Sequence, residues 1–272
     1  MPGELIVVIV LALLFDFLNG VHNSSNIVAT MISSRAFRPQ TALTLTAVSH
    51  FLGPFIFGVA VAKTIGDEVA ETGALTLHVI TACLIGAILW NLLTWFLGIP
   101  SSSSHALIGG LVGAIAMGAG FDAIKLSGLE KVLIALFTSP IIGFALGFVI
   151  MRFIFFLVRG ATPGINEFFK RAQLRTLGGK FYKIRPVHSF ASQLTSGIVI
   201  LTASLFGGPV STTQVVSSAI IGVGSAERLG KVGWSVAGDI VTAWIVTIPA
   251  TALLSAGIYL LLAKIPARTG IF

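Results

Sequence analysis

The sequence predicts an all-α integral membrane protein, a polytopic helical bundle. Of its 272 residues 55% are hydrophobic and only 10% are charged, and the mean hydropathy is +0.98. A soluble domain spends about a quarter of its residues on charged side chains, so this chain has too few to cover a surface that faces water. Several apolar runs reach the roughly 20 residues with which a helix crosses the hydrocarbon core. Their continuous rather than alternating pattern disfavours the strands of a membrane barrel.

The apolar runs divide the chain into two membrane halves. They lie at 5–31, 41–62, 75–97, 105–120, 131–158, 188–206, 211–224 and 232–262. The expected organisation is a first half at 1–158, a basic cytoplasmic loop at 159–187, and a second half at 188–272. Basic loops stay on the cytoplasmic side of a membrane, so we expect a multi-pass protein of the cell (inner or plasma) membrane. The basic residues are expected to contact lipid, and no nucleic acid is expected as a partner.

Counting the spans from the basic loop assigns each remaining connection to the outside or the inside of the membrane. The loops at 63–74, 121–131 and 207–210 are expected outside, and those at 98–104 and around Glu227 inside. Short segments with polar tips have an alternative interpretation, because they can be re-entrant rather than spanning.

An internal repeat is the most informative feature of the chain. Gly98–His105 matches Gly207–Gln214 at a constant difference in residue number, and the same difference pairs Glu130 with Asp239. On the expected topology the two copies start from opposite faces. The sequence therefore predicts inverted repeats with broken or re-entrant helices, an arrangement of transporters whose site lies between the repeats.

Each copy carries a hydroxyl cluster at the start of a helix. The clusters follow a Gly-x-Pro break, so their backbone N–H groups are free and lie at the positive end of the helix dipole. Ordinary N-capping explains one such cluster, but two inverted clusters favour a shared site for a small oxyanion. The predicted anion-binding residues are Ser102, Ser103, Ser104, Ser211, Thr212, Thr213 and Gln214.

A polar run interrupts the first apolar segment after Gly20. It contains His22, Asn23, Ser24 and Asn26 and continues to Thr30. A broken helix lining a cavity would satisfy these groups and expose carbonyls to a cation. The alternative is a helix that ends near Gly20 and a polar loop after it.

Carboxylates inside membrane segments usually mark ion pathways. Asp16, Asp239 and Glu130 are therefore candidates for coupling to Na⁺ or H⁺, with Asn23 and Asn26 beside them. A position near the membrane boundary is the alternative for Glu130 and Asp239. His22 and His105 border polar motifs, but the histidines have no metal-ligand spacing, and no metal or other cofactor is expected. Adjacent residues on a helix point to different faces, so Ser104 and His105 do not predict a hydrolase, and no enzyme is expected.

Three segments resemble the inorganic phosphate transporter (PiT) family: Phe15–Asn26, Gly98–His105, and Arg185 through Gln214 to Pro249. The resemblance implies cation-coupled phosphate uptake, with phosphate held between the paired motifs and Na⁺ or H⁺ beside it, often in a homodimer. It assigns Asn23 and Asn26 to substrate and cation. Asn23 stands where the family commonly has an acidic residue, and Gln214 where a histidine is common.

The second half lacks the first element of the repeat. Nothing at 140–190 corresponds to 15–62, and the family's second Asn-Asp signature would fall between Gln173 and Leu174. A partner protomer that completes the site, an internally deleted relative, and an omitted segment are all open. The functional hypotheses are a phosphate symporter working by alternating access, a sulfate or other oxyanion permease, and a non-transporting accessory or scaffold protein. An acceptor such as Asp16 would favour phosphate, because phosphate can donate a hydrogen bond and sulfate cannot.

Overall fold

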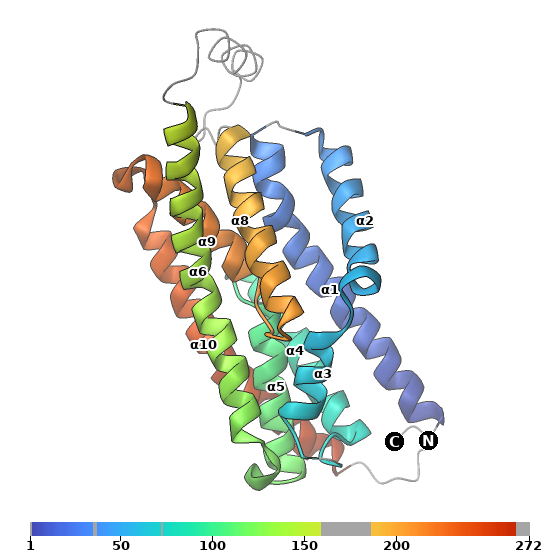
Figure 1. Ribbon diagram of the computed structural model, residues 1–272. Coiled ribbons are helices and arrows are strands. Elements are labelled where there is room, and N and C mark those ends of the chain that lie inside the picture. The colour runs from blue at the N-terminus through green and yellow to red at the C-terminus, as the bar shows by residue number, and fades with distance from the viewer. Residues whose placement is uncertain (1, 35–36, 72, 159–185, 265–272) are drawn as a thin grey trace.

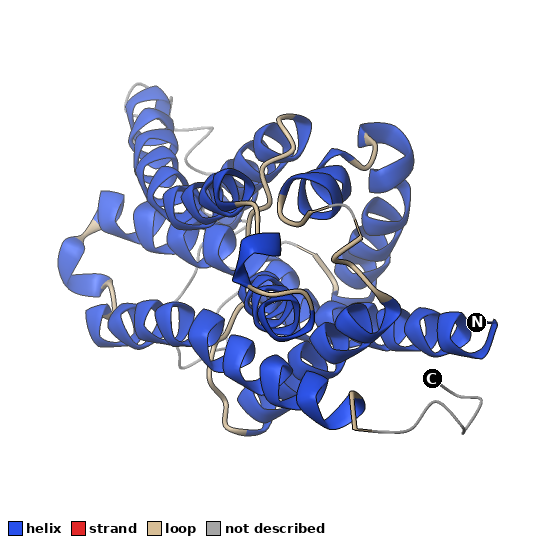
Figure 2. Ribbon diagram, turned by 90° about the horizontal axis from the view of Figure 1, so that it is seen from below, coloured by secondary structure: helices blue, strands red, loops and turns tan. Residues whose placement is uncertain are grey.

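The computed structural model describes residues 2–34, 37–71, 73–158 and 186–264, and these residues form a helical bundle (Figure 1). Helices and connecting loops make up this part of the chain (Figure 2), with an isolated bridge between Ala70 and Ile124. The all-α prediction is confirmed. The helices are α1 (Pro2–Ser33), α2 (Pro39–Phe57), α3 (Ala60–Lys63), the π-helical turn η1 (Thr64–Glu68), α4 (Leu77–Phe96), α5 (Ser103–Gly118), α6 (Leu126–Val158), α8 (Pro186–Leu205), α9 (Thr212–Glu227) and α10 (Trp234–Leu262).

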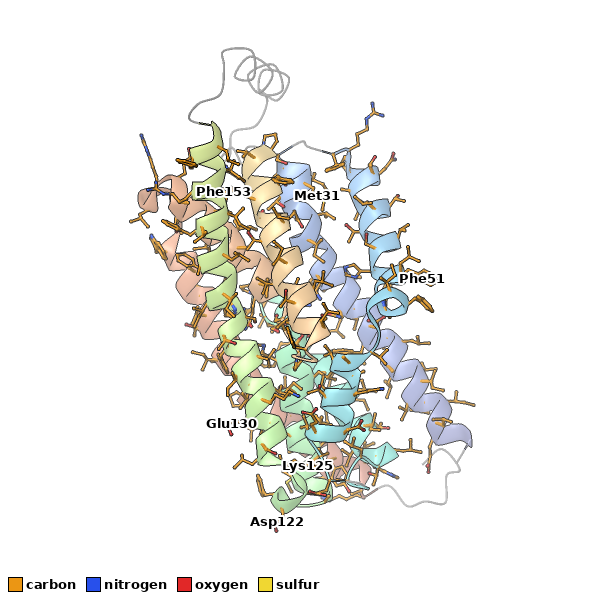
Figure 3. The ribbon with its side chains drawn as sticks, in the orientation of Figure 1. Met31, Phe51, Asp122, Lys125, Glu130 and Phe153 are labelled. Atoms are coloured by element: carbon orange, nitrogen blue, oxygen red, sulfur yellow. The ribbon has the colours of Figure 1, made fainter. Side chains whose placement is uncertain are left out.

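Several helices have the length and composition of membrane spans. They are Gly3–Asn23, Leu77–Phe96, Leu126–Leu157 and Ala237–Leu262, and a fifth candidate is the pair Pro39–Ile56 and Ala60–Glu68, bent by 65°. Their outward side chains are apolar and exposed, as at Phe51 and Phe153 (Figure 3). A surface of this kind is stable only against lipid or another apolar partner. The predicted loop at 159–187 lies almost entirely outside the described residues, so the division into two halves stays a prediction.

Two hairpins enter the bundle from opposite ends. The α4–α5 hairpin occupies the lower half of Figure 1 and the α8–α9 hairpin the upper half. Their turns meet, because the Oγ atoms of Ser102 and Ser211 are 2.8 Å apart. The prediction that 98–104 and 207–210 lie at opposite membrane faces is therefore wrong, and the meeting of the turns fits the re-entrant alternative. Helix length is the physical reason: α5 and α9 have 16 residues each, about 24 Å, which is shorter than the hydrocarbon core of about 30 Å.

The repeat offset reproduces the helix boundaries. Ser102 and Ser211 are 109 apart in number. The same offset added to the bounds of α4 gives those of α8, and added to those of α5 it gives those of α9. Gly98 and Gly207, which precede the hydroxyl clusters, both have a φ of 68°, a conformation that favours glycine. The repeat is thus supported by matching helices as well as by matching residues.

Each hairpin packs against a long helix with which it is not paired in the hairpin. Helix α5 lies against α10, and α9 lies against α6. A Cβ atom on Gly113 would lie 2.0 Å from the carbonyl oxygen of Ala252, and one on Gly222 would lie 2.1 Å from that of Phe144. Glycine at both positions lets the helix backbones touch, as small residues do in membrane bundles. This exchange of partners holds the two hairpin turns at the same depth.

The close contact at Gly222 predicts an unusual response to alanine. Gly222→Ala should lower the melting temperature of the protein in detergent, because overpacking costs about 1–3 kcal/mol and outweighs the helix propensity of alanine. Gly257→Ala is the matched control, since Gly257 is also helical but has no atom within 4 Å of a built Cβ. It should leave the melting temperature unchanged or raise it. Equal effects of the two changes would contradict the backbone contact.

Candidate functional site

Ser102 and Ser211 each cap a helix and also join the two hairpins. Ser102 Oγ accepts from the backbone N–H of His105, and Ser211 Oγ from that of Gln214, both at 3.3 Å. In addition, Ser102 Oγ donates to Ser211 Oγ at 2.8 Å, and both residues are buried. The capping interpretation and the paired interpretation of these clusters therefore hold together.

A second pair of residues at the same offset lies against the first. His105 Nε2 is 3.2 Å from Gln214 Nε2, and His105 Nδ1 is 2.8 Å from Ser102 Oγ. If the Gln214 amide donates to Nε2, then Nδ1 carries the ring proton and donates to Ser102, which donates to Ser211. The two hairpins are thus joined by a chain of hydrogen bonds that runs in one direction. Gln214 Oε1 is buried without a partner among the described residues.

Two asparagines of α1 connect both hydroxyl clusters. Asn19 Oδ1 accepts from Ser103 Oγ and also from Asn23 Nδ2. Asn23 Oδ1 accepts from Thr213 Oγ1 at 2.7 Å. Asn19 was not among the site residues predicted from the sequence. Its spacing of four residues from Asn23 was the available signal, since residues four apart share one face of a helix.

Helix α1 is continuous through the polar run, so the expected break after Gly20 is wrong. The asparagines need no unwound backbone, because hydroxyls from the two hairpins satisfy them. Further along, Gln193 of α8 donates to Thr30 Oγ1 at 2.9 Å and to the carbonyl oxygen of Ile27 at 2.5 Å. Thr30 therefore holds α8 to α1 rather than lining the site. The side chains of Ser24 and Asn26 lie outside the described residues.

A cavity of about 190 Å³ lies beside the meeting point of the two hairpins. A water molecule takes about 30 Å³ in the liquid, so the cavity has room for a small oxyanion. Its described lining offers hydroxyls and an amide but no lysine or arginine. Ser102 and Ser211 lie outside the lining, while Ser101 and Thr94, which the sequence analysis did not select, belong to it. The lining residues are His22, Asn23, Thr94, Trp95, Gly98, Ile99, Pro100, Ser101, Ser103 and Thr213.

Ser104 and Thr212 are set apart from the other predicted hydroxyls. Both are half-buried, whereas Ser103 and Thr213 are buried. Within the described part of the chain, neither Ser104 nor Thr212 has a side-chain hydrogen bond.

The three candidate carboxylates lie away from the cavity. Asp16 is exposed on α1, Asp239 is exposed near the start of α10, and Glu130 is exposed near the lower end of α6 (Figure 3). Asp122 and Lys125 lie at the same lower end, so Glu130 fits the alternative of a boundary position. The cation-coupling role of all three carboxylates stays a prediction.

The comparisons with known proteins agree with one another. The model of the phosphate transporter family matches residues 19–173 and 167–255. A Rhizobium meliloti protein described as a probable low-affinity inorganic phosphate transporter is 36% identical over 318 residues, which cover 94% of this chain and 95% of the relative. A Bacillus subtilis protein with the same description is 34% identical, covering 94% and 96%. A solved structure, the sodium-dependent phosphate transporter, has a TM-score of 0.79 at 20% identity, covering 97% of this chain and 100% of that one, which shows a shared fold.

The alignment with the Rhizobium meliloti relative is longer than this chain. It spans 318 residues, whereas the whole chain has 272, so part of the relative has no counterpart here. The two matches to the family model meet at 167–173, which is where the sequence analysis placed the missing element.

Family and architecture follow from these matches. The relatives are transporters and not enzymes, as predicted, and the apolar helices are those of a multi-pass plasma membrane protein. The chain belongs to the phosphate transporter family.

Proposed function

We propose that this chain moves inorganic phosphate across the plasma membrane together with a cation, by alternating access. The observation that carries the proposal is the meeting of two oppositely entering helix starts, with their hydroxyls beside a cavity. The descriptions of the relatives name inorganic phosphate, and that of the solved structure names sodium dependence.

Phosphate would bind through neutral donors. The hydroxyls of Ser101, Ser103 and Thr213 line the cavity, and the starts of α5 and α9 add the positive ends of two helix dipoles, each equivalent to about half a charge. Phosphate at neutral pH is a strong acceptor. It would therefore accept hydrogen bonds from the hydroxyls of Ser103 and Thr213, which otherwise donate to asparagine oxygens.

That exchange supplies a route to cation coupling. When Ser103 and Thr213 turn to the anion, Asn23 Oδ1 loses the donor Thr213, and Asn19 Oδ1 keeps only the amide of Asn23 as a donor. Hard cations prefer oxygen ligands, and an amide oxygen freed beside a bound anion is a favourable place for Na⁺. Each ligand then raises the affinity for the other, as reciprocal coupling requires.

The contact between the hairpins is weak enough to open. Ser102 and Ser211 are joined by a neutral hydrogen bond, and such a bond contributes only about 1 kcal/mol. Helices α4, α5 and α10 pack together as one group, and α6, α8 and α9 pack together as another. These two groups of helices can rock against each other about this contact. Rocking would open the cavity to one side of the membrane at a time.

The distinction between phosphate and sulfate would depend on an acceptor in the cavity wall. Asp16 was the predicted acceptor, but Asp16 lies outside the lining, and Asn23 lies within it. Asn23 Oδ1 has a second lone pair beside the one used by Thr213. Hydrogen phosphate can donate to that lone pair, and sulfate has no proton to donate.

A non-transporting accessory role is the second candidate function. The observation that favours it is the segment that the Rhizobium meliloti relative possesses and this chain lacks.

Homodimer formation, which the family resemblance implies, also stays a prediction. Uptake of radiolabelled phosphate into proteoliposomes, with and without Na⁺ or pH gradients, separates a transporter from an accessory protein.

The hydroxyls of the cavity wall should determine affinity for the anion. Ser103→Ala combined with Thr213→Val should raise the phosphate concentration for half-maximal uptake about tenfold or more, because each lost hydrogen bond contributes about 1 kcal/mol. Thr138→Val is the control, since Thr138 is exposed on α6 and bonds only within its helix. Unchanged affinity in the double variant would show that these hydroxyls serve only the protein.

Asn23 should determine selectivity. In the parent protein sulfate should compete poorly with labelled phosphate, and Asn23→Ala should narrow the difference between the two anions about tenfold, the effect of one hydrogen bond to a buried donor. Gln40→Ala removes an exposed amide at the start of α2 and should leave the selectivity unchanged. Full selectivity in Asn23→Ala would assign discrimination to another group.

A further inference from the structure

We propose that a transmembrane helix of a separate polypeptide completes the site, by packing on α8 and presenting amide or carboxylate oxygens to Ser104 and Thr212. The identity of the site as an anion site rests on the proposed function. The unfilled position itself rests on the repeat and on burial.

The hydrogen bonds of α1 define what is missing. Asn19 accepts from Ser103, and Asn23 accepts from Thr213. By the repeat offset, Ser103 corresponds to Thr212, and Thr213 corresponds to Ser104. Among the predicted hydroxyls of the two clusters, these are the ones without a hydrogen bond to the described residues, and both are half-buried. The second half therefore keeps the donors of this arrangement while the helix that would carry the acceptors is absent from the described chain.

Burial shows the same gap one layer further out. On α4, Thr81 is 3% exposed and Ile88 is 6% exposed. Their counterparts on α8 are Phe190, which is 61% exposed, and Gly197, which is also exposed. Helix α1 packs far more extensively on α4 than on α8. The face of α8 that corresponds to the covered face of α4 therefore stands open.

The direction of the chain is consistent with an inverted counterpart of α1. Helix α1 runs from the lower to the upper end of Figure 1, and α2, α3 and η1 return to the lower end. An inverted copy must begin and end at the upper end, between Val158 and Pro186. The two family-model matches meet there, at 167–173. The alignment with the relative exceeds this chain by more than the roughly 20 residues of a membrane span.

A second copy of this chain does not fit the open position. The basic stretch at 159–187 gives every copy the same orientation in the membrane, so another α1 would run in the wrong direction. Its Asn19 and Asn23 are also engaged with its own hairpins. The occupant is therefore a different chain, with an apolar span of about 20 residues and two polar side chains four positions apart.

Disulfide crosslinking tests this proposal with a defined probe. The probe is the segment of the Rhizobium meliloti relative that has no counterpart here, expressed as a separate polypeptide in the same membrane, with single cysteines placed in turn along its first apolar run. The chain carries Cys83→Ala, which removes its only cysteine, together with Ser104→Cys, Thr212→Cys or Phe190→Cys. Phe190 lies outside the site, so it reports on packing even if a change at a hydroxyl position disturbs folding.

The expected result is a crosslink from each of the three positions to the probe, with the partners of Ser104 and Thr212 about one helical turn apart. Thr138→Cys, on the exposed face of α6, should give none. Crosslinks between two copies of the chain at Thr212, or no crosslink from any position with the probe present in the membrane, would overturn the proposal.

Phosphate uptake separates this inference from the proposed function. With the probe present, the phosphate concentration for half-maximal uptake should fall about tenfold, the effect of one to two added hydrogen bonds. Crosslinks without any uptake would support the added helix and refute phosphate transport. The opposite result has two parts: the chain alone takes up phosphate and the probe does not improve this uptake, and Thr212→Cys reacts equally with an aqueous maleimide with and without the probe. That result would refute the added helix and support transport.

Discussion

The whole arrangement depends on two helix starts that satisfy each other inside the bundle. The first amides of a helix have no partner within it, and the hydrocarbon core offers no water to replace one. Ser102 and Ser211 meet this need as caps, and their hydroxyls also bond to each other. The exchanged packing of α5 on α10 and of α9 on α6 serves to bring these two ends together.

The proposed anion site, built from hydroxyls and helix dipoles, would suit a transporter, which must release what it binds. A lysine or arginine in the cavity wall would hold an anion by a full charge in a medium of low dielectric constant, where such attraction is large. The described lining has neither. Partial charges and hydroxyl donors would bind an anion strongly enough for it to enter the cavity and weakly enough for it to leave. The internal hydrogen bonds to Asn19 and Asn23 keep the donors satisfied while no anion is present.

The sequence predicted the pairing of residues better than their depth. A shared site for two inverted helix starts required Ser102 and Ser211 to meet, and they do, together with His105 and Gln214. The alternation of spans placed the turns at the membrane faces instead, because a short apolar run resembles a span until its length is compared with the core. Helical spacing also gave no orientation for Asp16, which lies on the exposed face of α1.

The polar run of α1 shows a second limit of local patterns. Asparagines in an apolar segment predict a break only if nothing nearby can satisfy them, and the partners of Asn19 and Asn23 on the hairpins are distant along the chain. The same reasoning bears on the open side of the site. Ser104 and Thr212 lie next to Ser103 and Thr213, which have acceptors, and burying a hydroxyl without a partner costs free energy. The constraint that joins the two hairpins therefore also calls for an acceptor-bearing helix against α8.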